Sequence, residues 1–194
     1  MDLGALETAL GSLLGAEIRN LQRLAGGASR ETWAFDAVAG DTVRPLILRR
    51  DPPGALRTGM ALEAALLASA AGAGVPVPAV VATSDDPAVL GAAFVVMERV
   101  DGESVPRRIL RDEGLSGARS QLAAQCGEIL AAIHRIPLDG LPALDGQDPL
   151  RQWRAVLDDL GQPHPAFELG FRWLDAHRPP SRPPALVHGD FRNG

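Results

Sequence analysis

The spacing of apolar residues changes at about Val100, and no other feature of the chain constrains its fold as strongly. Before that point, short apolar runs such as RPLILRRD and AAFVVMERV alternate with turns that contain glycine or proline, a pattern typical of strands. Two stretches rich in Leu or Ala, residues 1–15 and 55–73, favour helices. The first hundred residues therefore predict a small β-sheet that carries one major helix.

After Val100 the apolar residues follow helical spacing. Between Leu115 and Pro137, steps of four, three, four and three place one continuous apolar face on a helix, made of Leu122, Cys126, Ile129, Ile133 and Ile136. We expect two further helices, near 150–160 and 165–176, and a short strand at 185–188. The predicted fold is α+β with two lobes, a sheet-and-helix lobe over 1–100 and a mostly helical lobe over 101–194.

The composition excludes several classes of protein. A chain of 194 residues that is 46% hydrophobic and 22% charged can bury a core. Its net charge of −5 argues against a dedicated nucleic-acid-binding protein. No apolar run approaches the ~20 residues that span a bilayer, and the single cysteine, Cys126, cannot form an intrachain disulfide. We expect a cytoplasmic protein that binds neither nucleic acid nor membrane, and no pattern indicates its oligomeric state.

Glycines and arginines in the first hundred residues are candidates for an anion site. Gly26 and Gly27, followed by Ser29, lie between two predicted strands. Adjacent glycines there form either a plain hairpin turn or a loop whose N–H groups converge on a phosphate. Arg49 and Arg50 end a strand and point to opposite faces. Either one faces inward toward phosphates and the other faces solvent, or both are solvated charges at a strand end, which is the better interpretation of these two residues taken alone.

Two further segments offer candidates in the same part of the chain. Since the sequence contains no lysine, any site that needs a cation must use arginine. Glu63, on the predicted major helix, is either an exposed carboxylate or the partner of the inward arginine. In VVMERVDG, the backbone near Glu98 and Val100 either hydrogen-bonds a purine edge, with Met97 packed nearby, or belongs to an ordinary core strand.

The tripeptide His188-Gly189-Asp190 follows an apolar run near residue 194. An aspartate in this arrangement suits a base that accepts a proton from an attacking hydroxyl, with the histidine bracing the loop. Taken alone, the tripeptide is common and uninformative. The other histidines have no metal-ligand spacing, and Cys126 is better explained as a buried apolar residue than as a nucleophile.

The order of these motifs is that of a kinase-like fold. Through LAGGASRET, LILRRDPPG, FVVMERVDG and LVHGDFRNG, nearly the whole chain resembles the aminoglycoside phosphotransferase and choline kinase-like family. Within the family it most resembles members related to the kinase-like domain attached to some acyl-CoA dehydrogenases. The resemblance implies a protein-kinase-like fold and the ATP- and Mg²⁺-dependent transfer of phosphate to a hydroxyl of a small molecule.

The resemblance also assigns roles to single residues. It implies that Asp190 is the catalytic aspartate and that His188 braces it. Arg49 takes the place of the strand cation that is usually lysine, and Glu63 that of its helix partner. The residues implied in binding the nucleotide are then Gly26, Gly27, Ser29, Arg49, Glu63, Glu98 and Val100.

One part of the family pattern is not in the chain. The family motif His-x-Asp-x-x-x-x-Asn places a magnesium-binding Asn five residues after Asp190, past Gly194, and Asn193 does not fill that role. We therefore expect the Mg²⁺ ligands beyond residue 194 and the chain to be a C-terminally truncated, inactive piece of a phosphotransferase. The alternative is a non-catalytic nucleotide-binding or interaction module. Aminoglycosides, amino alcohols, sugars and hydroxyacyl groups all stay open as acceptors.

Overall fold

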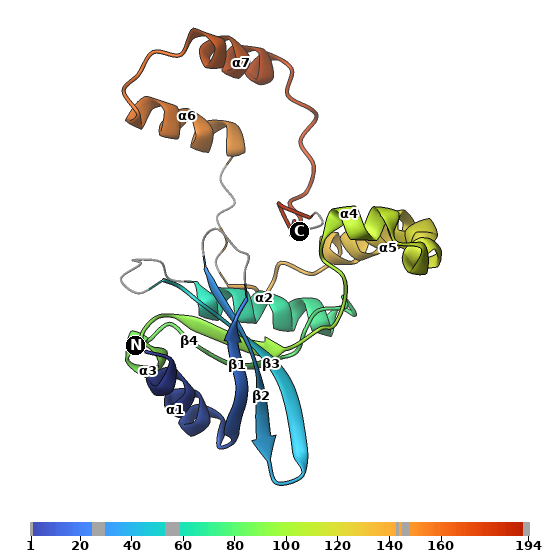
Figure 1. Ribbon diagram of the computed structural model, residues 1–194. Helices are drawn as coiled ribbons and strands as arrows, with labels where there is room; N and C mark the ends of the chain where they lie inside the picture. Colours follow the sequence, from blue (N-terminus) through green and yellow to red (C-terminus); the bar gives the residue numbers. More distant parts are fainter. Residues whose placement is uncertain (1, 25–29, 53–58, 143, 145–147, 192–194) are drawn as a thin grey trace. The chain divides into compact units, whose positions relative to one another are not determined.

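A computed structural model describes residues 2–24, 30–52, 59–142, 144 and 148–191 (Figure 1). The N-terminal elements are α1 (Leu3–Leu14), β1 (Glu17–Arg23), β2 (Glu31–Ala39), β3 (Thr42–Arg50), α2 (Met60–Gly72), β4 (Val80–Ser84), α3 (Pro87–Leu90) and β5 (Phe94–Glu98). The elements that follow are α4 (Pro106–Arg111), the 3₁₀-helix η1 (Glu113–Leu115), α5 (Ser116–His134), α6 (Pro149–Asp159) and α7 (Pro165–Ala176). The α+β class predicted from the sequence is confirmed.

The strands form one antiparallel sheet in the order β1-β2-β3-β5-β4. Strands β2 and β3 pair along their whole length, from Glu31 opposite Arg50 to Ala39 opposite Thr42. A two-residue turn joins them, and its first residue, Gly40, has φ of 57°, a conformation that costs glycine little. This hairpin brings the end of β3 next to the start of β2, which decides which charged residues meet.

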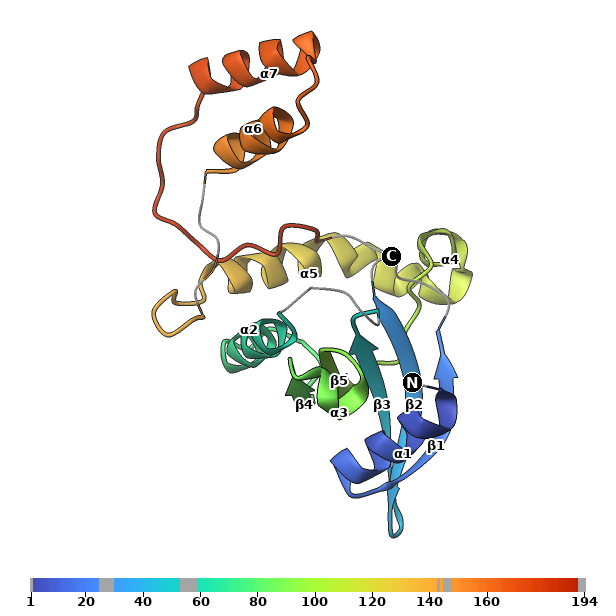
Figure 2. The same ribbon diagram turned by 90° about the vertical axis from the view of Figure 1, so that its left-hand side faces the viewer.

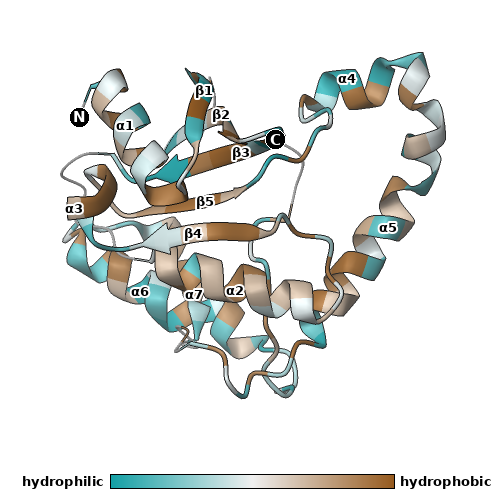
Figure 3. Cartoon of the chain, turned by 90° about the horizontal axis from the view of Figure 1, so that it is seen from below, coloured by the Kyte–Doolittle hydropathy of each residue, from teal (hydrophilic) through white to brown (hydrophobic). Residues whose placement is uncertain are grey.

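Different helices cover the two faces of the sheet (Figure 3). The face under α1 and α3, here called the α1 face, packs around a cluster of buried residues: Leu6, Leu10, Ile18, Phe35, Ala37, Leu46, Leu48, Leu90, Phe94 and Val96. The opposite face, here called the α2 face, packs against α2 through Met60, Ala64, Ala93, Val95 and Met97. Because side chains alternate along a strand, neighbouring residues of β3 and β5 belong to different faces.

Helix α5 carries the apolar face that the sequence predicts. Four of the five predicted positions lie on α5, and the fifth, Ile136, follows its end; all five are partly or fully buried. Ile133 and Ile136 pack with Ala70 and Val75 at the end of α2, and Leu186 lies against this cluster. The segment that leads to His188 is thus anchored beside the end of α5.

The predicted strand at 185–188 is absent from the described part of the chain, where these residues have no regular secondary structure. Leu186 packs on the cluster at the end of α5, whereas Val187 is 63% exposed. A strand forms only where a neighbouring strand completes its backbone hydrogen bonds. A run of apolar residues does not show whether such a neighbour exists.

The chain divides into two compact units, Met1–Pro142 with Ala185–Gly194, and Ala143–Pro184. The second unit holds α6 and α7, at nearly the positions that the sequence predicts (Figure 2). This division does not test the lobe boundary expected near residue 100, which stays a prediction.

Candidate functional site

Arg49 and Glu63 form an ion pair on the α2 face of the sheet. Arg49 lies one residue before the end of β3, and Glu63 lies in the first turn of α2. The Nη1 of Arg49 donates to Oε1 of Glu63. The Arg49 side chain is 37% exposed, so part of its guanidinium reaches solvent. The structure thus brings together the two residues that the resemblance assigns as strand cation and helix partner, and their role toward a nucleotide stays a prediction.

The first turn of α2 is fixed by an aspartate from outside the helix. Asp85, which follows β4, accepts hydrogen bonds from the backbone N–H groups of Met60 at 3.0 Å and Ala61 at 3.2 Å. These donors have no partner within the helix, so the carboxylate acts as an N-terminal cap. Met60 is fully buried against the sheet. Cap and anchor together set where Glu63 points.

Two residues that the sequence pattern did not single out complete the cluster. Nη1 of Arg30 donates to Oε2 of Glu63, while its Nε donates to Oδ1 of Asp51 at 3.1 Å. The Asp51 side chain is only 3% exposed, and its Oδ2 has no hydrogen-bond partner among the described residues. We call Arg30, Arg49, Asp51 and Glu63 the four-charge cluster. The one sequence signal for it is a charged residue, Asp51, directly after a buried strand.

Arg50 lies on the α1 face and is almost completely buried, with 3% of the residue exposed. Its Nε donates to Oε2 of Glu31 at 2.8 Å, and its Nη1 donates to the carbonyl oxygen of Leu90 at 2.9 Å. The opposite orientation of the two arginines is therefore as predicted, and the alternative of two solvated charges at the strand end is wrong for Arg50. Helices α1 and α3 cover that face, so this arginine is part of the core.

The partner of Arg50, Glu31, is held in its charged form. Burial raises the pKa of Glu31, but the hydrogen bond and charge of Arg50, with the charge of Arg23, outweigh it and hold the pKa below its ordinary value. An ionised carboxylate at 13% exposure is stable here because its cation is close. This pair therefore belongs to the folded core.

At the end of β5, Val100 remains available for the predicted contact with a purine, whereas Met97 is part of the core. Val100 is 72% exposed, and none of the described backbone hydrogen bonds uses its N–H. The N–H of Glu98 donates to the carbonyl of Ala79 at 2.9 Å, so it is already used within the sheet. Met97 is buried against α2. Contacts of Glu98 and Val100 with a purine stay a prediction.

His188 and Asp190 share a tight local turn. The backbone N–H of Asp190 lies 3.3 Å from Nδ1 of His188, in a hydrogen bond in which the ring accepts. The ring of His188 also meets that of Phe191 edge-on, with centroids 5.4 Å apart. Gly189 between them has φ of 78°. His188 is therefore bonded to the backbone of Asp190, while its role in bracing a catalytic loop and the catalytic role of Asp190 stay predictions.

Some candidates lie outside the described residues. These are Gly26, Gly27 and Ser29, as well as Asn193. Within the described ranges, no group of three or more His, Cys, Asp or Glu residues is placed to hold a metal ion. In the same ranges, none of the helices has the length and apolar character needed to cross a membrane.

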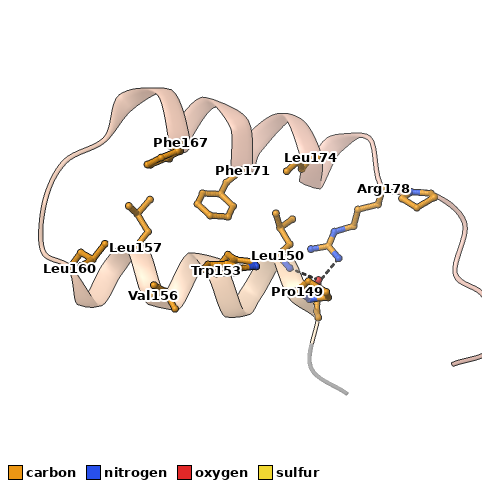
Figure 4. A pocket seen from close by; sticks show the side chains of 12 residues that line it. Pro149, Leu150, Trp153, Val156, Leu157, Leu160, Phe167, Phe171, Leu174 and Arg178 are labelled. Carbon is orange, nitrogen blue, oxygen red and sulfur yellow. Dashed lines mark hydrogen bonds and ion pairs between the residues drawn. The ribbon is translucent and has the colours of Figure 1, made fainter. Parts of the chain in front are cut away.

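The second unit contains a hollow that the sequence did not predict. Helices α6 and α7 enclose about 710 Å³ between largely apolar side chains, among them Trp153, Leu157 and Phe171 (Figure 4). Arg178 closes one end through a 2.6 Å bond to Asp148. That bond, against a smaller effect of burial, keeps the pKa of Asp148 below its ordinary value. None of the predicted site residues lies in this unit.

Comparisons with known proteins agree with this arrangement. The model of the phosphotransferase enzyme family matches residues 20–194. Acyl-CoA dehydrogenase family member 10 of Mus musculus is 30% identical over 168 residues, which cover 77% of this chain and 15% of that protein. Probable acyl-CoA dehydrogenase IBR3 of Arabidopsis thaliana is 30% identical over 191 residues, covering 86% of this chain and 22% of that protein.

A solved structure extends the likeness to the fold. The crystal structure of a candidate aminoglycoside phosphotransferase from Ralstonia eutropha JMP134 superposes with a TM-score of 0.64 at 23% identity, over 92% of this chain. The chain spans 54% of that protein and less than a quarter of either curated relative. The fold is therefore that of a kinase-like phosphotransferase. With nine tenths of its length inside the family match, the chain belongs to the phosphotransferase enzyme family.

Proposed function

We propose that the protein transfers a phosphoryl group from ATP to a hydroxyl of a small molecule. The observation that carries the proposal is the Arg49–Glu63 pair, in which a partly exposed cation is held at a strand end by a helix carboxylate. A guanidinium is always charged and has five N–H donors in a planar fork. One N–H bonds to Glu63, and others remain for phosphate oxygens.

Each candidate residue has a part in this reaction. Arg49 binds and orients the phosphates, and Gly26, Gly27 and Ser29 are proposed to bind them as well. The backbone near Glu98 and Val100 hydrogen-bonds the edge of the purine. Asp190 takes the proton from the attacking hydroxyl, and His188 holds the turn that carries it.

Phosphoryl transfer depends mainly on positioning and on neutralising charge, and Mg²⁺ supplies part of that neutralisation when bound. The described residues offer no cluster that fits this ion. We propose that its ligands lie outside the described residues. A cytoplasmic location, where ATP is available, belongs to the same proposal.

The test compares wild type with Asp190→Asn in the full-length protein, measuring ADP release with a panel of small hydroxyl compounds. Loss of a general base lowers the turnover by about 10²–10⁴-fold, while the Kd for ATP is expected to change by less than about twofold, since the base does not hold the nucleotide. Asp175→Asn, an exposed carboxylate of α7, is the matched control and is expected to turn over like wild type. Equal turnover by wild type and Asp190→Asn contradicts the proposal, and ATP binding without any turnover favours the non-catalytic module.

A further inference from the structure

We propose that Arg30 and Asp51 are positioning residues for the phosphate-binding cation: they hold Glu63 so that it grips Arg49 by one oxygen only. The inference rests on the proposed function, because it assigns two further residues to the same nucleotide site. It begins from a geometric fact. The carboxylate of Glu63 is shared, with Oε1 accepting from Arg49 and Oε2 from Arg30.

Sharing matters because an arginine and a carboxylate prefer to pair through two parallel hydrogen bonds. If both oxygens of Glu63 were available to Arg49, the pair would take up two N–H groups of the guanidinium. With Arg30 on Oε2, only Nη1 of Arg49 is engaged by Glu63. Arg30 thus preserves the donors of Arg49 that a phosphate would use.

Burial increases from one end of the four-charge cluster to the other. The exposed fraction of the side chain is 37% for Arg49, 23% for both Glu63 and Arg30, and 3% for Asp51. The most buried member is the anchor, and the most exposed member is the one that can meet a ligand. A buried carboxylate is costly unless a cation compensates it, so Asp51 fixes Arg30 in place.

Asp51 is itself held at both its backbone and its side chain. Its N–H donates to the carbonyl of Ala93 at 3.0 Å, just before β5. Its Oδ1 accepts from Arg30 at 3.1 Å, while its Oδ2 has no hydrogen-bond partner among the described residues. Arg30 is therefore the cation that the described residues provide for this buried carboxylate.

The test separates positioning from simple stabilisation with Arg30→Met and the double variant Arg30→Met/Asp51→Asn. The single variant leaves a buried charge without its cation, so its Tm is expected to fall by about 4–8 °C or more. Asn is neutral and has the shape of Asp, so the double variant is expected to regain most of that Tm. Its Kd for ATP, measured by calorimetry, is nevertheless expected to stay about tenfold weaker than wild type, the loss of roughly one hydrogen bond to a charged group.

Recovery of both Tm and ATP affinity in the double variant would overturn the inference, since Arg30 would then be structural only. Arg30→Lys is a second test. It keeps a positive charge near Asp51, so we expect a Tm near that of wild type. One ammonium cannot reproduce the two directed bonds of the planar guanidinium, so we expect ATP binding to be weakened. Wild-type affinity in Arg30→Lys would also count against the inference. Arg19→Met, which removes an exposed pair with Glu17, is the matched control and should change neither quantity.

The outcome also distinguishes this inference from the proposed function. If wild type does not bind ATP at all, the proposed nucleotide site is wrong. If wild type binds ATP and Arg49→Met does not, while the double variant binds like wild type, the site stands and only the role of Arg30 and Asp51 fails.

Discussion

The two faces of the sheet place neighbouring residues of one strand in opposite roles. On the α1 face, Arg50 is buried under α1 and α3 and donates to Glu31 and to the carbonyl of Leu90. On the α2 face, Arg49 keeps more than a third of its side chain exposed. A single step along β3 therefore separates a cation of the core from a cation that can meet a ligand.

The difference teaches that the covering helix, rather than the residue type, decides what an arginine does. Helices α1 and α3 close their face with large apolar side chains such as Leu6, Leu10 and Leu90. Helix α2 instead brings the carboxylate of Glu63 over the sheet. This carboxylate forms an ion pair with Arg49 and leaves part of the arginine side chain exposed. Substitutions on the two faces are expected to differ accordingly.

The largest expected effect is loss of apolar packing on the α1 face. Phe94→Ala removes a fully buried ring, and we expect it to lower the free energy of unfolding by about 3–5 kcal/mol. Thr32→Ala, at a half-buried position beside Arg49 on the α2 face, should change it by less than about 0.5 kcal/mol. Urea unfolding followed by circular dichroism checks both. Similar losses for the two variants would mean that the faces are equally closed.

The second prediction compares the two arginines directly. Arg50→Met leaves the nearly buried carboxylate of Glu31 with only the more exposed Arg23, 3.4 Å away, as its cation, so we expect a loss of about 3 kcal/mol in unfolding free energy. Arg49→Met removes a partly exposed ion pair, which solvent screens, so its loss is expected to be about 0–1 kcal/mol. Thermal melts of the two variants give the comparison. A larger loss for Arg49→Met would reverse the assignment of the faces.

How far the sequence predicts this arrangement depends on how local each feature is. Strand alternation predicted that Arg49 and Arg50 lie on opposite faces, and helical spacing predicted the apolar face of α5. Both predictions succeed because these periods involve only residues close together in the sequence. The contacts of Arg30 join residues 21 and 33 positions apart, so they follow from the pairing of β2 with β3 and from the placement of α2. No local pattern contains that information.

The same reasoning explains the two predictions that were wrong. Residues 185–188 have the apolar composition of a strand, but a strand needs a hydrogen-bonding partner elsewhere in the chain. The interpretation of Arg49 and Arg50 as two solvated charges assumed that both faces of the strand end are open, whereas α1 and α3 close the face of Arg50. The assignment of Arg49 and Glu63 as a pair came from the family resemblance, which carries three-dimensional information that spacing lacks.

A third prediction uses pH to probe the α1 face. The pKa of Glu31 is lowered in the folded protein, so its ionised form stabilises the fold above the pKa that it has when unfolded. That stability is lost as the pH falls from about 4.5 through the lower, folded pKa. We expect Glu31→Gln to be less stable than wild type at pH 7 and to show a shallower loss of stability on acidification. Parallel pH profiles would show that Glu31 is not coupled to folding.

A further small effect is expected on the α2 face. Arg99 pairs with Asp36 at 3.6 Å and with the exposed Asp101 at 3.4 Å. Such screened pairs contribute about 0–1 kcal/mol, so Arg99→Met should shift the unfolding free energy by no more than that. Chemical denaturation at low and high salt measures it. A loss comparable with that of Arg50→Met would show that this part of the α2 face is as closed as the α1 face.

The most direct test of the central claim is a calorimetric titration of ATP into wild type, Arg49→Met and the surface control Arg19→Met. We expect wild type and Arg19→Met to bind ATP with equal affinity. Arg49→Met is expected to bind about 10–100-fold more weakly, the loss of a hydrogen bond between charged groups worth about 1.5–3 kcal/mol, while its Tm stays close to that of wild type. Equal ATP affinity in Arg49→Met and wild type would contradict the claim that the exposed cation of β3 holds the phosphates.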